Sequence, residues 1–195
     1  HYVACNMVSG TVQAISFLIK KGHRVIGMIN GPEKLFASQE RKEGYQQSMT
    51  KSRLKFDPSL VVNTDLTLEG TQRAMEELLR SKRKPTAIVA FNDYVALDAI
   101  QFALKKKKKI NKDISFVSFA NLPISSYSAF PPMASVEQHP YIQGQKATEI
   151  LIELMTKNKE ETIQPDAYYK IIIESQLVLH KKNHLEKKIL TKLQP

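Results

Sequence analysis

The sequence has one cysteine, no tryptophan and no long hydrophobic run. A single thiol, Cys5, excludes an intrachain disulfide and fits a reducing compartment, so we expect a cytoplasmic location. No apolar stretch reaches the length of a membrane span and no signal peptide is visible, which predicts no membrane association. The chain also starts at His1 rather than at a methionine, so we expect a fragment of a longer protein.

Motifs that hold phosphates, metals or nucleophiles are missing as well. The sequence contains no G-x-x-x-x-G-K-[ST] loop, no G-x-G-x-x-G after its first strand and no G-x-S-x-G elbow. Its histidines have no metal-ligand spacing, and the pair His180 and His184 is typical of a solvated, lysine-rich tail. We therefore predict that the chain is not an enzyme and uses no metal and no cofactor.

Acidic residues are outnumbered, with 19 Asp and Glu against 29 Lys and Arg, which gives a net charge of +10. An excess of this size favours an anionic partner such as nucleic acid. The densest run, Lys105–Lys109, comes at the expected end of a helix, where lysines complement exposed carbonyl groups. It has neither interleaved aromatic residues nor a surrounding helix-turn-helix, so a solvated lysine surface is the favoured interpretation.

Strand-like and helix-like segments alternate along the chain. The stretch Leu18–Pro32 shows the pattern: the end of an amphipathic helix, a glycine stop, a buried strand and a Gly-Pro turn. Strands are expected at Arg24–Ile29, Leu60–Asn63, Thr86–Phe91, Ile114–Phe119, Met133–Val136 and, as one extended segment, Tyr169–Leu179. Helices are expected at Met7–Lys21, Ser38–Thr50, from Asp65 or Thr67 to Arg80, Asp93–Lys105 and Tyr141–Lys157. The alternation predicts an α/β protein with a doubly wound parallel sheet of about five strands.

Polar residues follow several of the expected strands at the point where each strand ends. In a parallel sheet all these ends meet at one edge, which is where such sheets bind ligands. Asn30, Asn92 with Asp93, and Asn121 would lie there, and Arg41 at the start of the next helix is close enough to point back at them. Asparagine and aspartate offer donors and acceptors to polar ligands, although they also cap helices and form turns. For Asp93, capping and ligand binding are equally supported.

Four stretches share their order and residues with a known family. They are GHRVIGMINGP from Gly22, Arg41 with Gly44-Tyr45, PTAIVAFNDYVALDAI from Pro85, and DISFVSFANLP from Asp113 with FPPMASVEQHPYIQGQKATEIL from Phe130. In combination they resemble the effector-binding domain of LacI/GalR-type transcriptional regulators, over nearly the whole chain up to Leu179. The resemblance implies a two-lobed, periplasmic-binding-protein-like fold, of which this chain holds mainly the C-terminal lobe.

The resemblance also implies a division of the chain. Residues 1–6 would end the N-terminal lobe and cross over, 7–137 would form the C-terminal lobe, and 138–166 would return to the N-terminal lobe as a helix and crossover. Residues 167–180 would be the return strand to the C-terminal lobe, and 181–195 a basic tail. Crossovers are expected near Cys5-Asn6, Glu137–Tyr141 and Gln164–Tyr168.

By the same resemblance, a small polar ligand, such as a sugar or related metabolite, would bind between the lobes. Its expected contacts are Asn6, Arg41, Asn92, Asp93, Asn121 and Gln138. Four places depart from the family pattern. Cys5 stands where an aspartate is usual, Ala120 replaces a second aspartate, and Leu66 replaces an aromatic residue. His180-Lys181-Lys182 replaces a terminal Arg-x-Ser pattern. These departures imply a pocket less suited to an ordinary sugar, or an atypical effector.

Two functional interpretations follow from this resemblance. The first is the effector-sensing and dimerisation domain of a DNA-binding repressor, with operator DNA bound through a headpiece absent from this chain. The homodimer interface would then include Tyr94, Leu97, Phe130 and Met133. The alternative is an extracytoplasmic sugar-binding receptor of a transport system.

Overall fold

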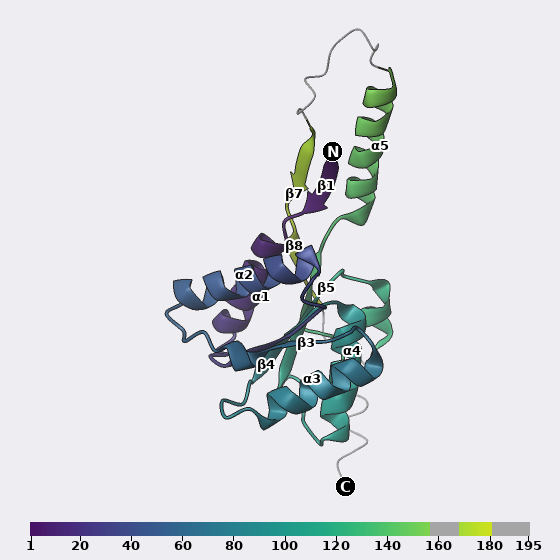
Figure 1. Cartoon of the computed structure of the whole chain (residues 1–195). Coiled ribbons are helices and arrows are strands. Elements are labelled where there is room, and N and C mark those ends of the chain that lie inside the picture. The colour runs from purple at the N-terminus through teal and green to yellow at the C-terminus, as the bar shows by residue number, and fades with distance from the viewer. Residues whose placement is uncertain (157–167, 181–195) are drawn as a thin grey trace.

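The computed structural model describes residues 1–156 and 168–180. Its main body is a six-stranded sheet in the order β3-β2-β4-β5-β6-β8 (Figure 1). The strands are β2 (Ile26–Asn30), β3 (Val61–Asn63), β4 (Ala87–Ala90), β5 (Ser115–Phe119), β6 (Ala134–Glu137) and β8 (Gln176–Leu179). The first five run parallel and β8 is antiparallel to β6. The predicted doubly wound parallel sheet is confirmed, with one antiparallel edge strand that was not expected.

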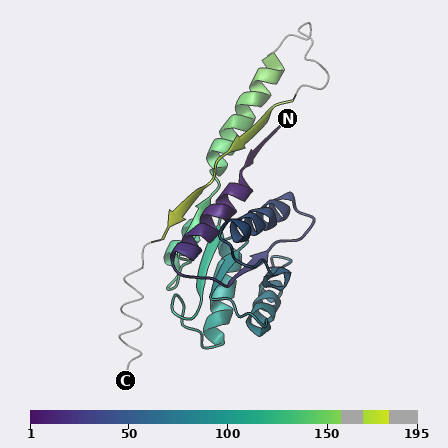
Figure 2. The same cartoon turned by 90° about the vertical axis from the view of Figure 1, so that its left-hand side faces the viewer.

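Helices cover both faces of this sheet. The elements are α1 (Met7–Lys20), α2 (Phe36–Lys51), α3 (Leu68–Arg80) and α4 (Asp93–Lys105), with short 3₁₀ turns η1 (Pro58–Leu60) and η2 (Pro123–Tyr127). Apolar side chains of α1 and α2 pack on one face and those of α3 and α4 on the other, forming two separate cores (Figure 2). Every residue of β2, β4 and β5 is buried, as expected of strands that are covered on both sides.

The two helices α1 and α2 cross very closely. A Cβ atom added at Gly44 would lie 2.7 Å from the Val8 carbonyl oxygen and 2.7 Å from the Thr11 side chain, so only glycine fits there. Next to it, the Tyr45 hydroxyl donates a hydrogen bond of 2.7 Å to the Ile26 carbonyl. These contacts fix α2 against β2 and therefore fix the side chains that α2 carries at its first turns.

A smaller unit projects from the sheet (Figure 1). It consists of β1 (Tyr2–Cys5), which pairs parallel with β7 (Lys170–Ile173), and of α5 (Pro140–Thr156) beside them. Several large apolar side chains of this unit are exposed, among them Tyr141 at 83% and Met155 at 76%. We call it the β1–β7–α5 unit.

The expected extended segment Tyr169–Leu179 is two strands that belong to different sheets. The chain leaves β7 and enters β8 at Glu174 and Ser175, so one crossing lies there. Most of the expected crossover Gln164–Tyr168 lies outside the described residues. The error arises because isoleucine-rich extended backbone has the same pattern in one sheet or in two. The basic tail 181–195, with His184, lies outside the described residues, as does Lys157, the expected end of α5.

Candidate functional site

The carboxyl ends of the parallel strands meet at one edge of the sheet, which we call the rim. Asn30 ends β2, Phe91 follows β4, Asn121 follows β5 by two residues, and Glu137 ends β6. The connections to the β1–β7–α5 unit leave from the same side, at Asn6 and after Glu137. Such an edge, beside a crossing between two units, is where open α/β sheets place their ligands.

Arg41 lies in the floor of the rim. Its side chain is 3% exposed, and its guanidinium carbon lies 4.2 Å from the ring centre of Phe91 and 4.3 Å from that of Phe119. The Nη1 atom donates a hydrogen bond of 3.1 Å to the carbonyl of Ala37. Its Nε–H has no partner, and no ion pair to Arg41 occurs among the described residues.

This guanidinium is a buried cation without a bound carboxylate. Burial lowers the pKa of Arg41 to about 10, while the neighbouring Glu40 acts in the opposite direction. Taking a charge out of water without pairing it costs free energy that cation–π contacts recover only in part. This arrangement fits a side chain whose hydrogen bonds are completed by a ligand, because the unpaired Nε–H of Arg41 would then donate to a ligand oxygen.

Two more unpaired polar atoms lie near Arg41. The Asn30 amide nitrogen donates a hydrogen bond of 2.9 Å to the Ser38 carbonyl, but its Oδ1 has no partner, and neither has the Ser38 hydroxyl. Both residues line a cavity of about 230 Å³ between α2 and the end of β3. The start of α2 is therefore the part of the rim with the most unused hydrogen-bonding capacity.

Asn92 and Asp93 have separate structural duties. Asn92, half-buried, caps α4 by accepting a hydrogen bond of 2.9 Å from the Val95 N–H, so it is the cap in place of Asp93. Asp93 is fully buried, and its carboxylate accepts from the Ser118 hydroxyl and, at 2.5 Å, from the Leu122 N–H. With no exposed surface, Asp93 holds the loop after β5 and offers no contact to a ligand, contrary to expectation.

Asn121 belongs to a polar network on the other side of the rim. Its Nδ2 donates to Glu137 at 3.0 Å, and its Oδ1 lies 3.3 Å from His180 Nε2. The other ring nitrogen of His180 lies 3.0 Å from the Pro132 carbonyl. The hydrogen bond from Asn121, together with the N–H of His139, holds the pKa of Glu137 below its usual value against the effect of burial. His180 is thus a bound, structural residue and not a solvated one.

Asn6 and Gln138 mark two crossings to the β1–β7–α5 unit. Asn6 caps α1 by accepting from the Ser9 N–H at 2.9 Å, and its Nδ2 donates at 2.9 Å to Glu174 at the third crossing. The Gln138 carbonyl accepts from the Gln143 side chain at 2.7 Å. The structure places Arg41 in the floor of the rim, Asn121 at one side, and Asn6 and Gln138 at its crossings.

Sequence reasoning missed Phe91, Phe119 and Glu137. The two phenylalanines enclose the guanidinium of Arg41, and Glu137 orients Asn121. A usable signal was present, because an aromatic residue ends or directly follows two successive buried strands, in AIVAF and in SFVSF. Phe119 also belongs to the core beneath α1 and α2, so an aromatic residue at the end of a strand can serve both the core and the rim.

The family model of the periplasmic binding protein-like domain matches residues 15–172. The chain belongs to this family. The HTH-type transcriptional repressor CytR of Escherichia coli (strain K12) is 30% identical over 148 residues, which are 76% of this chain and 43% of that protein. The repressor PurR of Haemophilus influenzae (strain ATCC 51907 / DSM 11121 / KW20 / Rd) is 31% identical over 172 residues, 88% of this chain and 50% of that one.

Solved structures agree with this assignment. A LacI-family regulatory protein from Chloroflexus aggregans superposes with a TM-score of 0.81 at 28% identity, covering 92% of this chain and 62% of that chain. The complex of the transcriptional regulator CelR with cellobiose gives a TM-score of 0.83 at 27% identity, covering 93% and 54%. The resemblance is confirmed: this is an effector-binding domain of the LacI type, whose relatives are regulators and not enzymes. The chain spans about half the length of the curated relatives that it matches.

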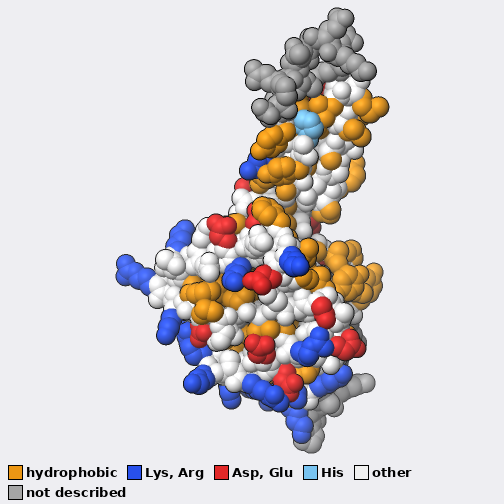
Figure 3. Space-filling view, in the orientation of Figure 1, with side chains coloured by type: hydrophobic (Ala, Val, Ile, Leu, Met, Phe, Trp, Pro, Cys, Tyr) orange, Lys and Arg blue, Asp and Glu red, His pale blue; other side chains and the backbone are white. Residues whose placement is uncertain are grey.

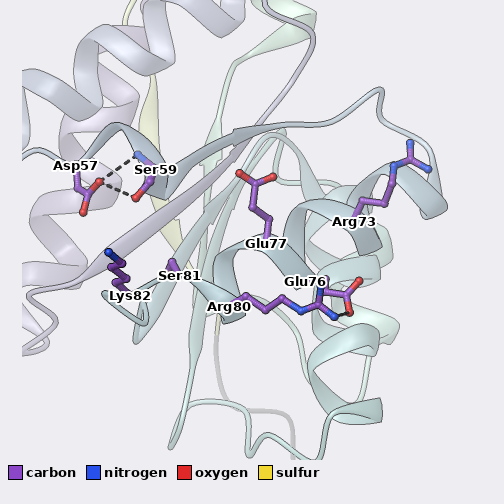
Figure 4. A pocket seen from close by; sticks show the side chains of 8 residues that line it. All are labelled: Asp57, Ser59, Arg73, Glu76, Glu77, Arg80, Ser81 and Lys82. Atoms are coloured by element: carbon purple, nitrogen blue, oxygen red, sulfur yellow. Dashed lines mark hydrogen bonds and ion pairs between the residues drawn. The ribbon is translucent and has the colours of Figure 1, made fainter.

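A larger cavity of about 740 Å³ in this domain lies away from the rim. It opens between η1, α3 and the loop after α3, and is lined by Asp57, Ser59, Arg73, Glu76, Glu77, Arg80, Ser81 and Lys82 (Figure 4). Arg80 pairs with Glu76 at 2.9 Å, and Asp57 binds Ser59. Asp57 and Arg73 pair instead with Arg83 and Asp65, which do not line the cavity. This cavity lies on the side of the sheet away from the crossings, so volume alone does not make it the candidate ligand site. No group of three or more metal-ligating side chains occurs within residues 1–156 and 168–180.

The domain also holds strained backbone at the rim. Ala120 has φ of +89° and Asn121 has φ of +48°, values that glycine and asparagine tolerate better than alanine. We expect Ala120→Gly to raise the free energy of unfolding by about 1 kcal/mol, because the strain at this residue would be relieved. Urea denaturation measures this, with Ala99→Gly inside α4 as the control that should lose a similar amount. A loss of stability in Ala120→Gly would contradict the strain.

Cys5 is buried beside the same crossings, 4% exposed. Burial raises the pKa of its thiol to about 11, and Glu174, Glu137 and Glu40 add repulsion. Because the thiolate is the reactive form, we expect only very slow reaction with a disulfide reagent such as DTNB at about pH 8, with a faster rate as pH rises toward 11. The unfolded chain in urea serves as the control and should react at once. Immediate stoichiometric reaction of the native domain would contradict this prediction.

Across residues 1–156 and 168–180, no helix is long and apolar enough to span a membrane.

Proposed function

We propose that this domain senses a small polar effector on behalf of a cytoplasmic LacI-type DNA-binding transcriptional regulator that acts as a repressor. The observation that carries the proposal is Arg41, a buried guanidinium between two aromatic rings with an unpaired Nε–H at the rim. The names of the relatives support the regulatory part, because CytR and PurR are both HTH-type transcriptional repressors.

The site favours an effector with several oxygen atoms. Arg41 would bind one oxygen of the ligand, while Asn92 and Asn121 would bind others through their amide groups. Cys5, Leu66 and Ala120 reduce the number of carboxylate and aromatic contacts, so a sugar derivative or related metabolite fits better than a bare hexose. The cellobiose complex of CelR supports the saccharide class.

Such an effector would act by bridging two bodies. One set of contacts comes from the rim, and a second set, at Asn6 and Gln138, comes from the crossings to the β1–β7–α5 unit. A ligand that binds better in one relative orientation of the two bodies shifts the population toward it. In the proposed regulator this shift would change the spacing of two DNA-binding headpieces in a homodimer.

The sequence that precedes His1 in its gene tests this proposal. A helix-turn-helix upstream is the expected result, because the relatives are HTH-type regulators. An export signal in that place would contradict the proposal and support the extracytoplasmic receptor instead.

We propose that the domain also forms a homodimer through α4 and the segment after η2. Val95 and Ile100 of α4 are 1% exposed and belong to the core, whereas Tyr94 on the same helix is 59% exposed. Leu97, Phe130 and Met133 are half-buried, and hydrophobic side chains gather on this side of the domain (Figure 3). Apolar surface of this kind fits a self-complementary interface.

The substitution Leu97→Glu tests this interface. We expect a folded monomer in sedimentation velocity, because a charge in the middle of an apolar interface is costly to bury. Phe36→Glu, 68% exposed at the start of α2 on the other face of the sheet, is the control and should remain dimeric. An unfolded chain would instead place Leu97 in the core, and an unchanged dimer would reject the interface.

A further inference from the structure

Most of the positive charge lies in four segments that precede β2, β3, β4 and β5. These segments, 20–25, 51–60, 80–86 and 105–114, contain sixteen lysines and arginines but only two acidic residues, Asp57 and Asp113. Their net charge of +14 exceeds that of the whole chain, so the remainder is net negative. The four strands are neighbours in the sheet, in the order β3-β2-β4-β5. We call this surface the basic edge.

The basic edge follows from the topology. In a doubly wound sheet each helix ends at the edge where the next strand begins, so the last turns of α1, α2, α3 and α4 all meet there. It is therefore the edge opposite the rim. Neighbouring strands are about 4.8 Å apart, so the four strands alone span about 15 Å, and the helices on both faces extend the surface further.

The charges of this edge are exposed and mostly unpaired. Fifteen of the sixteen cationic residues are exposed, Arg83 being half-buried. Ion pairs within residues 1–156 and 168–180 involve only two of them, Arg80 with Glu76 and Arg83 with Asp57. Figure 3 shows Lys and Arg side chains gathered along the lower margin of the six-stranded body, the margin away from the β1–β7–α5 unit.

Lysines at helix ends have an ordinary explanation, which is compensation of the helix dipole. Each helix carboxyl end carries about half an elementary negative charge, so four ends need about two positive charges. The basic edge has a surplus of fourteen. Compensation therefore accounts for a small part of the charge and leaves a strong positive field at this surface.

We propose that the basic edge binds the phosphate backbone of double-stranded DNA without reading its sequence. A broad, rigid row of cations matches the dense charge of a duplex, where binding is driven by the release of counterions. Single strands need exposed aromatic platforms, but Phe17 and Phe102 are half-buried beneath Lys21 and Lys106. A protein partner would need apolar anchors, and the exposed large hydrophobic residues of the described chain lie in other segments.

Binding at this edge would not obstruct the rim, because the two lie at opposite ends of the strands. The inference therefore does not depend on the proposed effector or on the operator. In a regulator it would supply a second, sequence-independent DNA contact. That contact would weaken steeply with salt, whereas binding of a neutral effector would not.

Fluorescence anisotropy of a labelled short duplex of arbitrary sequence tests the proposal with this chain. We expect binding at about 50 mM NaCl that weakens about a thousandfold by about 200 mM, as for some six phosphate contacts. Glutamine at all five positions of Lys105–Lys109 should weaken binding at least about tenfold and reduce the slope of log affinity against log salt. The matched control replaces the same number of lysines in the tail: Lys181, Lys182, Lys187, Lys188 and Lys192.

The outcomes separate the alternatives. Loss of affinity in the edge variant together with retention in the tail variant supports the proposal. Equal losses in both variants, a larger loss in the tail variant, or no binding by the unmodified chain would overturn it. Tighter binding of single-stranded DNA or of polyglutamate would overturn the choice of duplex DNA. Should the edge variant fail a circular dichroism check of folding, Lys82→Gln combined with Lys84→Gln gives the same test with a smaller expected loss.

Discussion

Replacement of Asp93 by alanine is expected to lower the free energy of unfolding by about 3 kcal/mol, because one buried and one half-buried donor lose their acceptor. These donors are the Ser118 hydroxyl and the Leu122 N–H, which the Asp93 carboxylate joins across the ends of α4 and β5. Chemical denaturation followed by circular dichroism measures the change. The loop after β5 should also lose its position, since the Leu122 N–H makes no other hydrogen bond within residues 1–156 and 168–180.

Asp98→Ala is the matched control for Asp93→Ala. Asp98 lies on the same helix and is half-buried, and burial together with Glu69 raises its pKa, so its charge does not stabilise the fold. We expect its removal to change stability by less than about 0.5 kcal/mol. Equal destabilisation by the two substitutions would show that Asp93 acts through helix α4 in general and not through its two bonds.

Arg41→Met is expected to stabilise the ligand-free domain by about 1 kcal/mol, since it removes a buried charge that no carboxylate balances. Methionine keeps the length of the side chain, and its sulfur packs well against the rings of Phe91 and Phe119. The melting temperature of the ligand-free domain should therefore rise. If the domain becomes more stable when Arg41 is replaced, then Arg41 does not serve folding, and a role in ligand binding explains its presence.

Lys42→Met is the control for this prediction, because it changes the same charge at the next position, where the side chain is exposed. Its melting temperature should stay within the range of ordinary surface substitutions. A clear loss of stability in Arg41→Met would mean that the cation–π contacts exceed the cost of burial and that Arg41 is a structural residue.

The parallel body of this domain could be predicted from sequence because its strands are short, buried runs between helices. In SFVSF and AIVA every residue faces a covering helix, so the runs are apolar or small throughout and easy to recognise. The helix stop at Gly22 and the first residue of α4 at Asp93 were also predicted. Local patterns sufficed there because local and long-range requirements agree.

The rim could be predicted only in outline. Strand ends predicted which polar side chains share one edge of the sheet, but the environment of each side chain depends on residues far away in the chain. Asp93 is removed from solvent by Ser118 and Leu122, and Arg41 is enclosed by two phenylalanines from separate strands. The sheet change at Glu174 depends on pairing with β1, at the other end of the sequence. None of these long-range contacts can be inferred from the hydrophobic periodicity of the segments that make them.

The most direct test of the central claim is a calorimetric titration of the full-length protein that carries this chain with a panel of saccharides that includes cellobiose. We expect one of these saccharides to bind, and to bind at least about tenfold more weakly in Arg41→Met, the loss expected for one hydrogen-bonding charge. Lys51→Met, which removes an exposed charge at the other end of α2, should leave the affinity unchanged. Equal affinity of the unmodified protein and Arg41→Met for that ligand would contradict the claim.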